Sequence, residues 1–215
     1  MAAPRVNIYG FPHKGLRNGL SQLMFQVSKT DVTSQASVAE LKSLSSTLVE
    51  LLDLHQQAED SVVLKDLETR VPGSTTKNHA DHDELHAKVA AFAAHIEGIE
   101  AGDSMAVTQQ ALDMVASFCS EYLMHMAEEE GEINEVIWAH FTDEEILQWQ
   151  GQIMGKLTPD QKMDWFRFIV PALNPMERQI MLGGVKEVLP PEAYQGILNM
   201  LSNYMSADEL APLAA

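Results

Sequence analysis

The stretch LSSTLVELLDLHQQAEDSVV, residues 44–63, decides the fold class. Its leucines and valines recur at steps of three and four residues, which is the spacing of one face of an α-helix. His55 and Glu59 interrupt that apolar face, and their spacing of four residues places both side chains on the same side of the helix. The stretch therefore predicts a buried helix face that carries two ionisable groups.

The same periodicity extends over most of the chain. Apolar residues at helical spacing predict helices over about residues 12–28, 35–69, 81–100 and 104–139, and we find no alternating pattern typical of a β-strand. The connections between these four segments are short, which favours antiparallel packing of neighbours. We therefore predict an all-α fold built around an up-down four-helix bundle.

The organisation changes after residue 141. Signals for the start of a helix, in most cases a capping residue followed three places later by Glu or Gln, recur every 16 residues. They begin at Thr142, Thr158, Asn174, Pro190 and Ser206. This period leaves helices of about three turns, which are too short to be stable alone. We predict a bundle at residues 1–141 and an appendage of short helices at residues 142–215, and we expect the bundle fragment to fold and bind metal without the appendage.

Composition excludes several classes of protein. The 215 residues include 14 basic and 31 acidic side chains, a formal net charge of −17, which rules out an extended surface for nucleic acid. A single cysteine, Cys119, cannot form an intrachain disulfide. We find neither a signal peptide nor the run of about 20 apolar residues that a membrane span needs. These features predict a cytoplasmic protein that binds neither nucleic acid nor membrane.

The sequence contains three pairs of potential metal ligands, and the two members of each pair are four residues apart. One pair lies on each of the last three bundle helices, and a further histidine lies at the start of the first helix. Each group continues the apolar stripe of its helix, so all of them are expected to face the interior. Burying so many ionisable groups costs several kcal/mol each unless they are paired, shifted in pKa or bound to metal. The predicted metal ligands are His13, His55, Glu59, His82, His86, His125 and Glu129.

Three neighbouring residues leave alternatives open. Glu130 competes with Glu129 for the same role, because it is the next residue on the same helix. His79, three residues before His82, is close enough along the helix to reach the site. Tyr122, one turn before His125, is either a hydroxyl near the metal or a core aromatic residue.

The donor set indicates which metal is expected. Five imidazoles and two carboxylates suit first-row transition metals better than calcium or magnesium, and two bridging carboxylates imply a pair of ions. Iron is the metal we expect. Ferritin-like di-iron bundles carry Glu-x-x-His motifs. This sequence contains none, which argues against that class.

These motifs together resemble a hemerythrin-like, or HHE cation-binding, domain over about residues 10–140. The resemblance rests on four elements in order along the chain, which are HKGLR from His13, HQQAE from His55, DHDELH from Asp81 and HMAEEE from His125. It implies one iron held by His82, His86 and His125 and a second held by His13 and His55, with Glu59 and Glu129 bridging. Under that ligand count the open coordination position lies on the second iron.

The resemblance also implies a function. We expect a non-haem di-iron protein that binds or senses dioxygen or a related small oxidant such as peroxide or nitric oxide, rather than an enzyme. One alternative is a di-iron oxidase or a peroxide-consuming enzyme. Another is a metal-buffering protein that binds a protein partner through residues 142–215.

Overall fold

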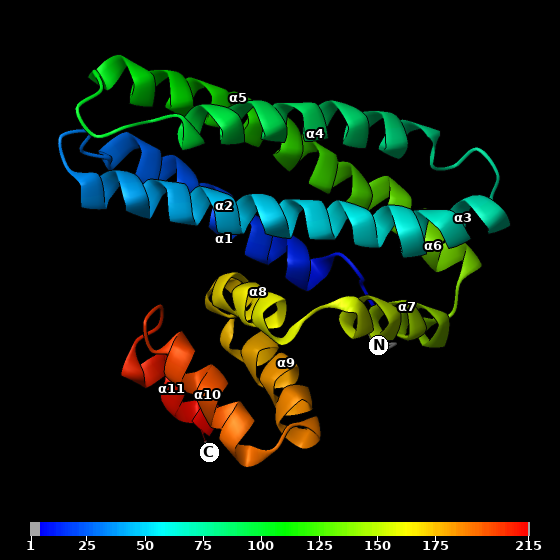
Figure 1. Cartoon of the computed structure of the whole chain (residues 1–215). Coiled ribbons are helices and arrows are strands. Elements are labelled where there is room, and N and C mark those ends of the chain that lie inside the picture. Colours follow the sequence, from blue (N-terminus) through cyan, green and yellow to red (C-terminus); the bar gives the residue numbers. More distant parts are fainter. Residues whose placement is uncertain (1–4, 215) are drawn as a thin grey trace.

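The computed structural model describes residues 5–214, and among them it contains helices and no strand, which confirms the all-α prediction. Four long helices form an up-down bundle (Figure 1). They are α1 (Gly10–Lys29), α2 (Gln35–Ala58), α4 (Thr76–Glu97) and α5 (Met105–Glu128). The bundle core consists of the apolar stripes of these helices, as the helical periodicity of the sequence requires.

Two of the bundle helices contain a wide turn. The helix α2 continues through η1 (Glu59–Val63) into α3 (Leu64–Arg70), and α5 continues through η2 (Glu129–Ile133) into α6 (Asn134–His140). Both turns are π-helical, with the N–H of Leu64 donating to the carbonyl of Glu59 and that of Asn134 donating to Glu129, five residues earlier in each case. Single π-helical turns within α-helices are frequent at functional sites. Here each turn begins at one of the predicted bridging glutamates.

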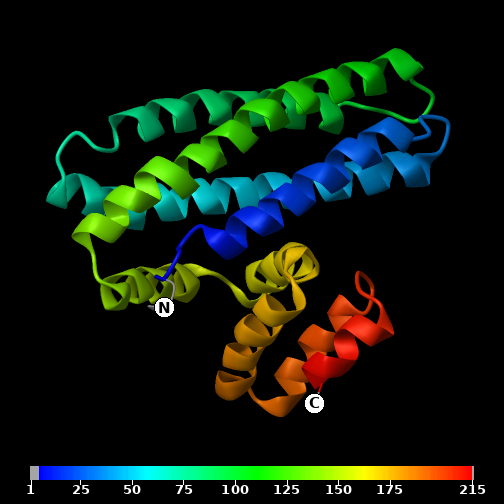
Figure 2. The same cartoon turned by 180° about the vertical axis from the view of Figure 1, so that it is seen from behind.

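Five short helices follow and lie on one side of the bundle (Figures 1 and 2). They are α7 (Asp143–Lys156), α8 (Pro159–Ala172), α9 (Pro175–Val188), α10 (Pro191–Leu201) and α11 (Ala207–Ala214). Their first residues follow the predicted period of 16. Reciprocal capping boxes pair Thr142 with Glu145, Thr158 with Gln161 and Asn174 with Glu177, which confirms these predicted helix starts.

Two of the short helices share hydrophobic clusters with the bundle. Trp165, Phe168 and Ile169 of α8 belong to the same buried cluster as the leucines of α1 and α2. Trp149 of α7 packs with residues of α3 and α6, and its indole N–H donates to Asp66 at 2.7 Å. The helices α9 to α11 form a smaller cluster with the opposite face of α8. Apolar packing therefore crosses the predicted boundary at residue 142.

Glycines explain how α8 approaches α1 so closely. A Cβ atom at Gly15 would lie 2.6 Å from Cγ1 of Ile169 and 3.2 Å from its backbone nitrogen. A Cβ at Gly19 would lie 3.3 Å from the ring of Phe168. Only residues without a side chain permit this spacing, so α1 is shaped to receive α8. None of the helices among residues 5–214 is long and apolar enough to cross a membrane.

Candidate metal centre

Six potential metal ligands meet inside the bundle, beside the two π-helical turns. They form two overlapping groups of four, and the candidate donor atoms within each group all lie within 4.8 Å of one another. One group contains His13 and His55, the other contains His82 and His125, and both groups contain two glutamates. The six residues are His13, His55, Glu59, His82, His125 and Glu129, and all are buried.

The histidines form two matching pairs. Nε2 of His13 lies 3.1 Å from Nε2 of His55, and their ring centroids are 5.0 Å apart. The rings of His82 and His125 have centroids 4.9 Å apart in a similar edge-on arrangement. Each pair combines a histidine near the start of one helix with the histidine of a His-x-x-x-Glu motif on the next helix. The structure thus separates two imidazole pairs, one from each half of the bundle.

Both glutamates divide their oxygens between the two histidine pairs. Oε1 of Glu59 lies 3.2 Å from Nε2 of His55, and its Oε2 lies 3.5 Å from Nε2 of His82. Oε2 of Glu129 lies 3.4 Å from Nε2 of His13, and its Oε1 lies 3.2 Å from Nε2 of His125. Each carboxylate therefore lies within reach of both histidine pairs.

The hydrogen bonding of the buried atoms tests whether a metal fits. Oε1 of Glu59, Oε2 of Glu129 and Nε2 of His82 are buried without any hydrogen-bond partner in the described part of the chain. Leaving such atoms unsatisfied costs about 1–3 kcal/mol each, and more for charged groups. Cation binding in the two groups would satisfy these atoms, so the donor set fits a metal.

The pKa values support the same conclusion. Burial and the neighbouring charge of Glu129 raise the pKa of Glu59, so both favour its protonated form. Burial also raises the pKa of Glu129, but hydrogen bonds from His125 and His82 outweigh burial and lower it. Burial, followed by the charge of His13, lowers the pKa of His55 and keeps that imidazole neutral. Neutral imidazole and carboxylate are the forms that bind metal, and a cation would replace the proton of Glu59.

A second pair of carboxylates orients two of the histidines. Glu130 lies 3.0 Å from Nδ1 of His13 and accepts two hydrogen bonds from Arg17, at 2.6 and 3.0 Å. Asp60 lies 2.9 Å from Nδ1 of His82. A proton on Nδ1 that is shared with a carboxylate leaves Nε2 free to bind metal and raises its basicity. Burial raises the pKa of Glu130, but the bonds from His13 and Arg17 prevail and lower it to about 2.

The structure thereby distinguishes the two neighbouring glutamates that the sequence left open. Glu129 points into the cluster, and Glu130 supports His13 from outside it. His79 does not reach the central cluster, because its Nδ1 lies 3.1 Å from Asp60 and its side chain is 49% exposed. Asp60, His79 and His82 form a third, more exposed group with donor atoms within 4.8 Å.

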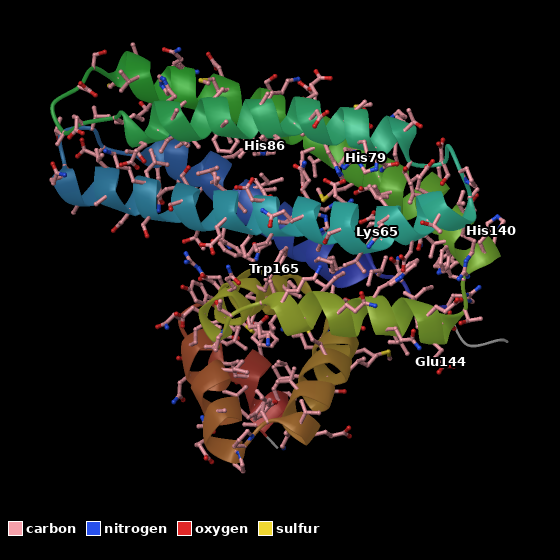
Figure 3. All side chains as sticks on the ribbon, turned by 45° about the vertical axis from the view of Figure 1, so that its right-hand side comes forward. Lys65, His79, His86, His140, Glu144 and Trp165 are labelled. Carbon is pink, nitrogen blue, oxygen red and sulfur yellow. The ribbon has the colours of Figure 1, made fainter. Side chains whose placement is uncertain are left out.

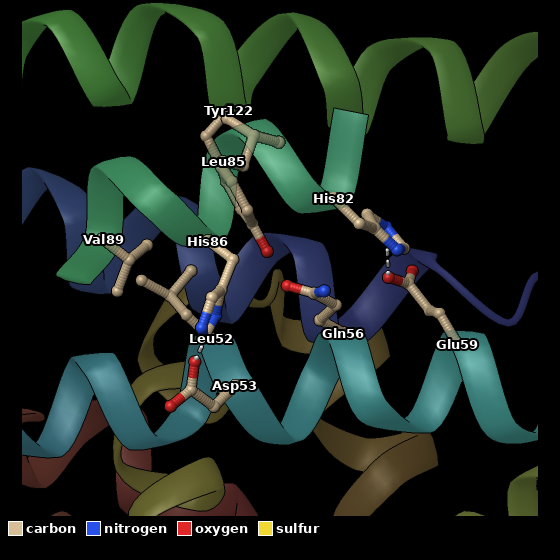
Figure 4. A pocket seen from close by; sticks show the side chains of 9 residues that line it. All are labelled: Leu52, Asp53, Gln56, Glu59, His82, Leu85, His86, Val89 and Tyr122. Carbon is tan, nitrogen blue, oxygen red and sulfur yellow. Dashed lines mark ion pairs between the residues drawn. The ribbon is translucent and has the colours of Figure 1, made fainter. Parts of the chain in front are cut away.

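His86 is the one predicted ligand that the structure does not bring into the cluster. Its side chain is 60% exposed, and its Nδ1 lies 3.6 Å from Asp53 of α2 rather than near the glutamates (Figures 3 and 4). The structure therefore gathers two histidines on each side of the cluster, whereas the prediction had three histidines for one ion and two for the other. The open coordination position on the ion of His13 and His55 stays a prediction.

The buried stripe of α4 explains the position of His86. This stripe advances from His82 by three residues to Leu85 and then by four to Val89. His86 is one residue beyond Leu85, so it lies at the edge of the contact between α2 and α4. The sequence carries a signal for this arrangement, because Leu85 is an apolar residue three positions after His82. The inward face of the helix continues through Leu85.

Three aromatic residues surround the centre without joining it. Tyr9 packs its ring on His13 with centroids 5.1 Å apart, and its buried hydroxyl has no hydrogen-bond partner among the described residues. Trp165, below α2 in Figure 3, packs against His55, and Tyr122 packs against His125. Burial and the charges of Glu59 and Glu129 raise the pKa of both tyrosines, so their hydroxyls stay protonated.

Three residues beside the centre were not predicted from the sequence, namely Tyr9, Arg17 and Asp60. Arg17 follows His13 by four residues, and Asp60 follows Glu59 as Glu130 follows Glu129, so both positions carried a spacing signal. Tyr9 precedes the predicted start of the first helix and carried no such signal.

Comparisons with known proteins agree with this geometry. The family model of the hemerythrin HHE cation-binding domain matches residues 8–137. A zinc finger protein BRUTUS-like from Arabidopsis thaliana is 24% identical over 188 residues, a match that covers 86% of this chain and 15% of that protein. The part of the chain outside the match is shorter than residues 142–215. The match therefore extends beyond the bundle. The chain spans about one seventh of that relative's length. No solved structure matches.

The matched residues contain all six candidate ligands of the cluster, and the fold around them is the expected bundle. The chain therefore belongs to the hemerythrin HHE cation-binding domain family.

Proposed function

We propose that this chain holds two iron ions and binds or senses dioxygen or a related small oxidant. The observation that carries the proposal is the division of each glutamate's two oxygens between the two histidine pairs. One ion would be held by His13 and His55 and the other by His82 and His125. A single ion would use one oxygen of each glutamate and leave the other oxygens unsatisfied in a buried site.

Iron suits this donor set because imidazole and carboxylate ligands together bind first-row metals, and each ion has only four protein ligands. When bound, two ferrous ions would supply two electrons and open positions for a small ligand. The protein itself orients His13 through Glu130 and His82 through Asp60, and burial keeps His55 neutral.

Binding is favoured over oxidation of an organic substrate as the first function to test, because the opening beside the cluster is small. The pocket there has a volume of about 10 Å³, which is room for about one water molecule. An organic substrate does not fit in that space.

The test is anaerobic reconstitution with ferrous iron, followed by elemental analysis and exposure to dioxygen. We expect about two iron ions per chain and an optical spectrum that changes on oxygenation. A folded protein that retains one ion or none would contradict the proposal. Sustained consumption of peroxide with a reductant present would identify an enzyme instead.

A further inference from the structure

A small pocket leads from the surface to the metal centre between α2 and α4 (Figure 4). Its outer end is the ion pair of His86 and Asp53, whose side chains are partly exposed to solvent. Its inner end is formed by Glu59 and His82, two ligands of the cluster. The pocket therefore connects solvent to one particular side of the centre.

Two polar side chains line this pocket in addition to the ion pair and the metal ligands. Gln56 lies on α2, and Tyr122 comes from α5 with its hydroxyl pointing toward α2, between His86 and Gln56 (Figure 4). The Tyr122 hydroxyl has no hydrogen bond to any of residues 5–214 in the structure. A protonated hydroxyl without a partner, next to an amide, is available to donate to a ligand in the pocket.

We propose that this pocket is the entry and holding position for the small ligand, with Tyr122 and Gln56 donating hydrogen bonds to it and His86 with Asp53 forming its mouth. The inference rests on the proposed function and adds to it the side of approach and the residues that select the ligand. The ligand reaches the ion of His82 and His125 first, which is the opposite side from the one that the sequence favoured.

The other side of the centre is closed. Tyr9 covers His13, the bidentate pair of Arg17 and Glu130 lies outside that ring, and Trp165 of α8 packs against His55. The side toward His82 has less cover, because α8 packs mainly on α1 and α2. A volume of about 10 Å³ is room for about one water molecule, so the pocket admits a small ligand or the end of a linear one and excludes a bulky ligand.

Azide is the probe for this proposal, since it is a small linear anion with an absorption band when bound to ferric iron. The matched variants are Tyr122→Phe and Tyr9→Phe, which each remove one hydroxyl next to the centre and keep the ring. We expect Tyr122→Phe to weaken azide binding about 3- to 10-fold, the value of one hydrogen bond. Tyr9→Phe should change it by less than about 2-fold, because its hydroxyl lies on the closed side.

Two further variants keep the test decisive if Tyr122→Phe folds poorly. Gln56→Met keeps the length of the side chain and removes the amide, so it should weaken azide binding by a similar factor. His86→Ala widens the mouth, so it should accelerate azide association several-fold while the iron content stays unchanged.

The outcomes separate this inference from the proposed function. Failure of the wild-type protein, loaded with two iron ions, to bind azide or nitric oxide would contradict the proposed function. Normal azide binding with equal effects of Tyr122→Phe and Tyr9→Phe, or a larger effect of Tyr9→Phe, would overturn the pocket assignment alone.

Discussion

The two halves of the bundle repeat the same architecture. The helices α2 and α5 each have 24 residues, η1 and η2 each have five, and α3 and α6 each have seven. A constant interval of 70 residues separates their corresponding first residues, and it also relates Glu59 to Glu129. Each half supplies one histidine from its first helix and a His-x-x-x-Glu motif from its second.

The surroundings of the two halves differ. The helix α8 packs on α1 and α2 and places Trp165 against His55, whereas the contact between α2 and α4 leaves a pocket beside His82. Glu130 is held by Arg17 at two atoms, whereas its counterpart Asp60 is paired with the half-exposed His79. The two matching groups of candidate ligands therefore have different surroundings, because α8 packs on the group that contains His55.

The largest expected effect concerns the glutamates that both halves share. Glu129→Ala should reduce the iron content from two ions to about none, because the oxygens of Glu129 face both histidine pairs. His55→Ala should remove about one ion only. Elemental analysis after desalting measures both, with the exposed His140→Ala as the control. Retention of one ion by Glu129→Ala would mean that the two halves bind metal independently.

The next largest effect concerns the packing of α8 against α1 and α2, which form the first half of the bundle. Phe168 is fully buried against α1, so Phe168→Ala should lower the free energy of unfolding by about 3–5 kcal/mol. Phe25→Ala removes the same ring from a site that is 67% exposed and should cost less than about 0.5 kcal/mol. Denaturant unfolding compares them. Equal costs would support a separable appendage and independent folding of residues 1–141.

A smaller effect is expected where α1 and α8 touch. Gly15→Ala forces Ile169 to move and should destabilise the protein by about 1–3 kcal/mol, despite the better helix propensity of alanine. Gly151→Ala on α7 meets nothing within 4 Å and should stabilise it by about 0.5–1 kcal/mol. Opposite signs in thermal unfolding would support the close packing of α8. A stabilising Gly15→Ala would contradict it.

The smallest effect is expected at His86, the additional histidine that made the predicted ligand sets of the two halves unequal. His86→Ala should leave two iron ions bound, because His86 faces Asp53 and solvent. His82→Ala, one turn away, should remove about one ion. Elemental analysis under the same conditions gives both values. Loss of an ion from His86→Ala would support the predicted arrangement, in which three histidines hold one ion and two histidines hold the other.

The sequence predicted the bundle and the inward ligands because both depend on local spacing. Residues four apart on a helix share a face whatever the helix packs against, so His55 with Glu59 and His125 with Glu129 were identified correctly as neighbours facing the interior. The capping boxes of α7 to α9 are also local, since their hydrogen bonds span three residues. Such features need no knowledge of the tertiary fold.

The remaining features depend on how the helices are placed relative to one another. His82 and His86 have the same local spacing as the other pairs, and only the packing of α4 on α2 decided that the inward stripe continues through Leu85. The contact of α8 with α1 joins residues about 150 positions apart, and no local pattern determines that pairing. Local spacing in the sequence identified most of the inward-facing residues, but not the outward position of His86. The tertiary structure alone decided which of them meet, and it left one side of the centre open, because helix packing depends on the shapes of both surfaces at once.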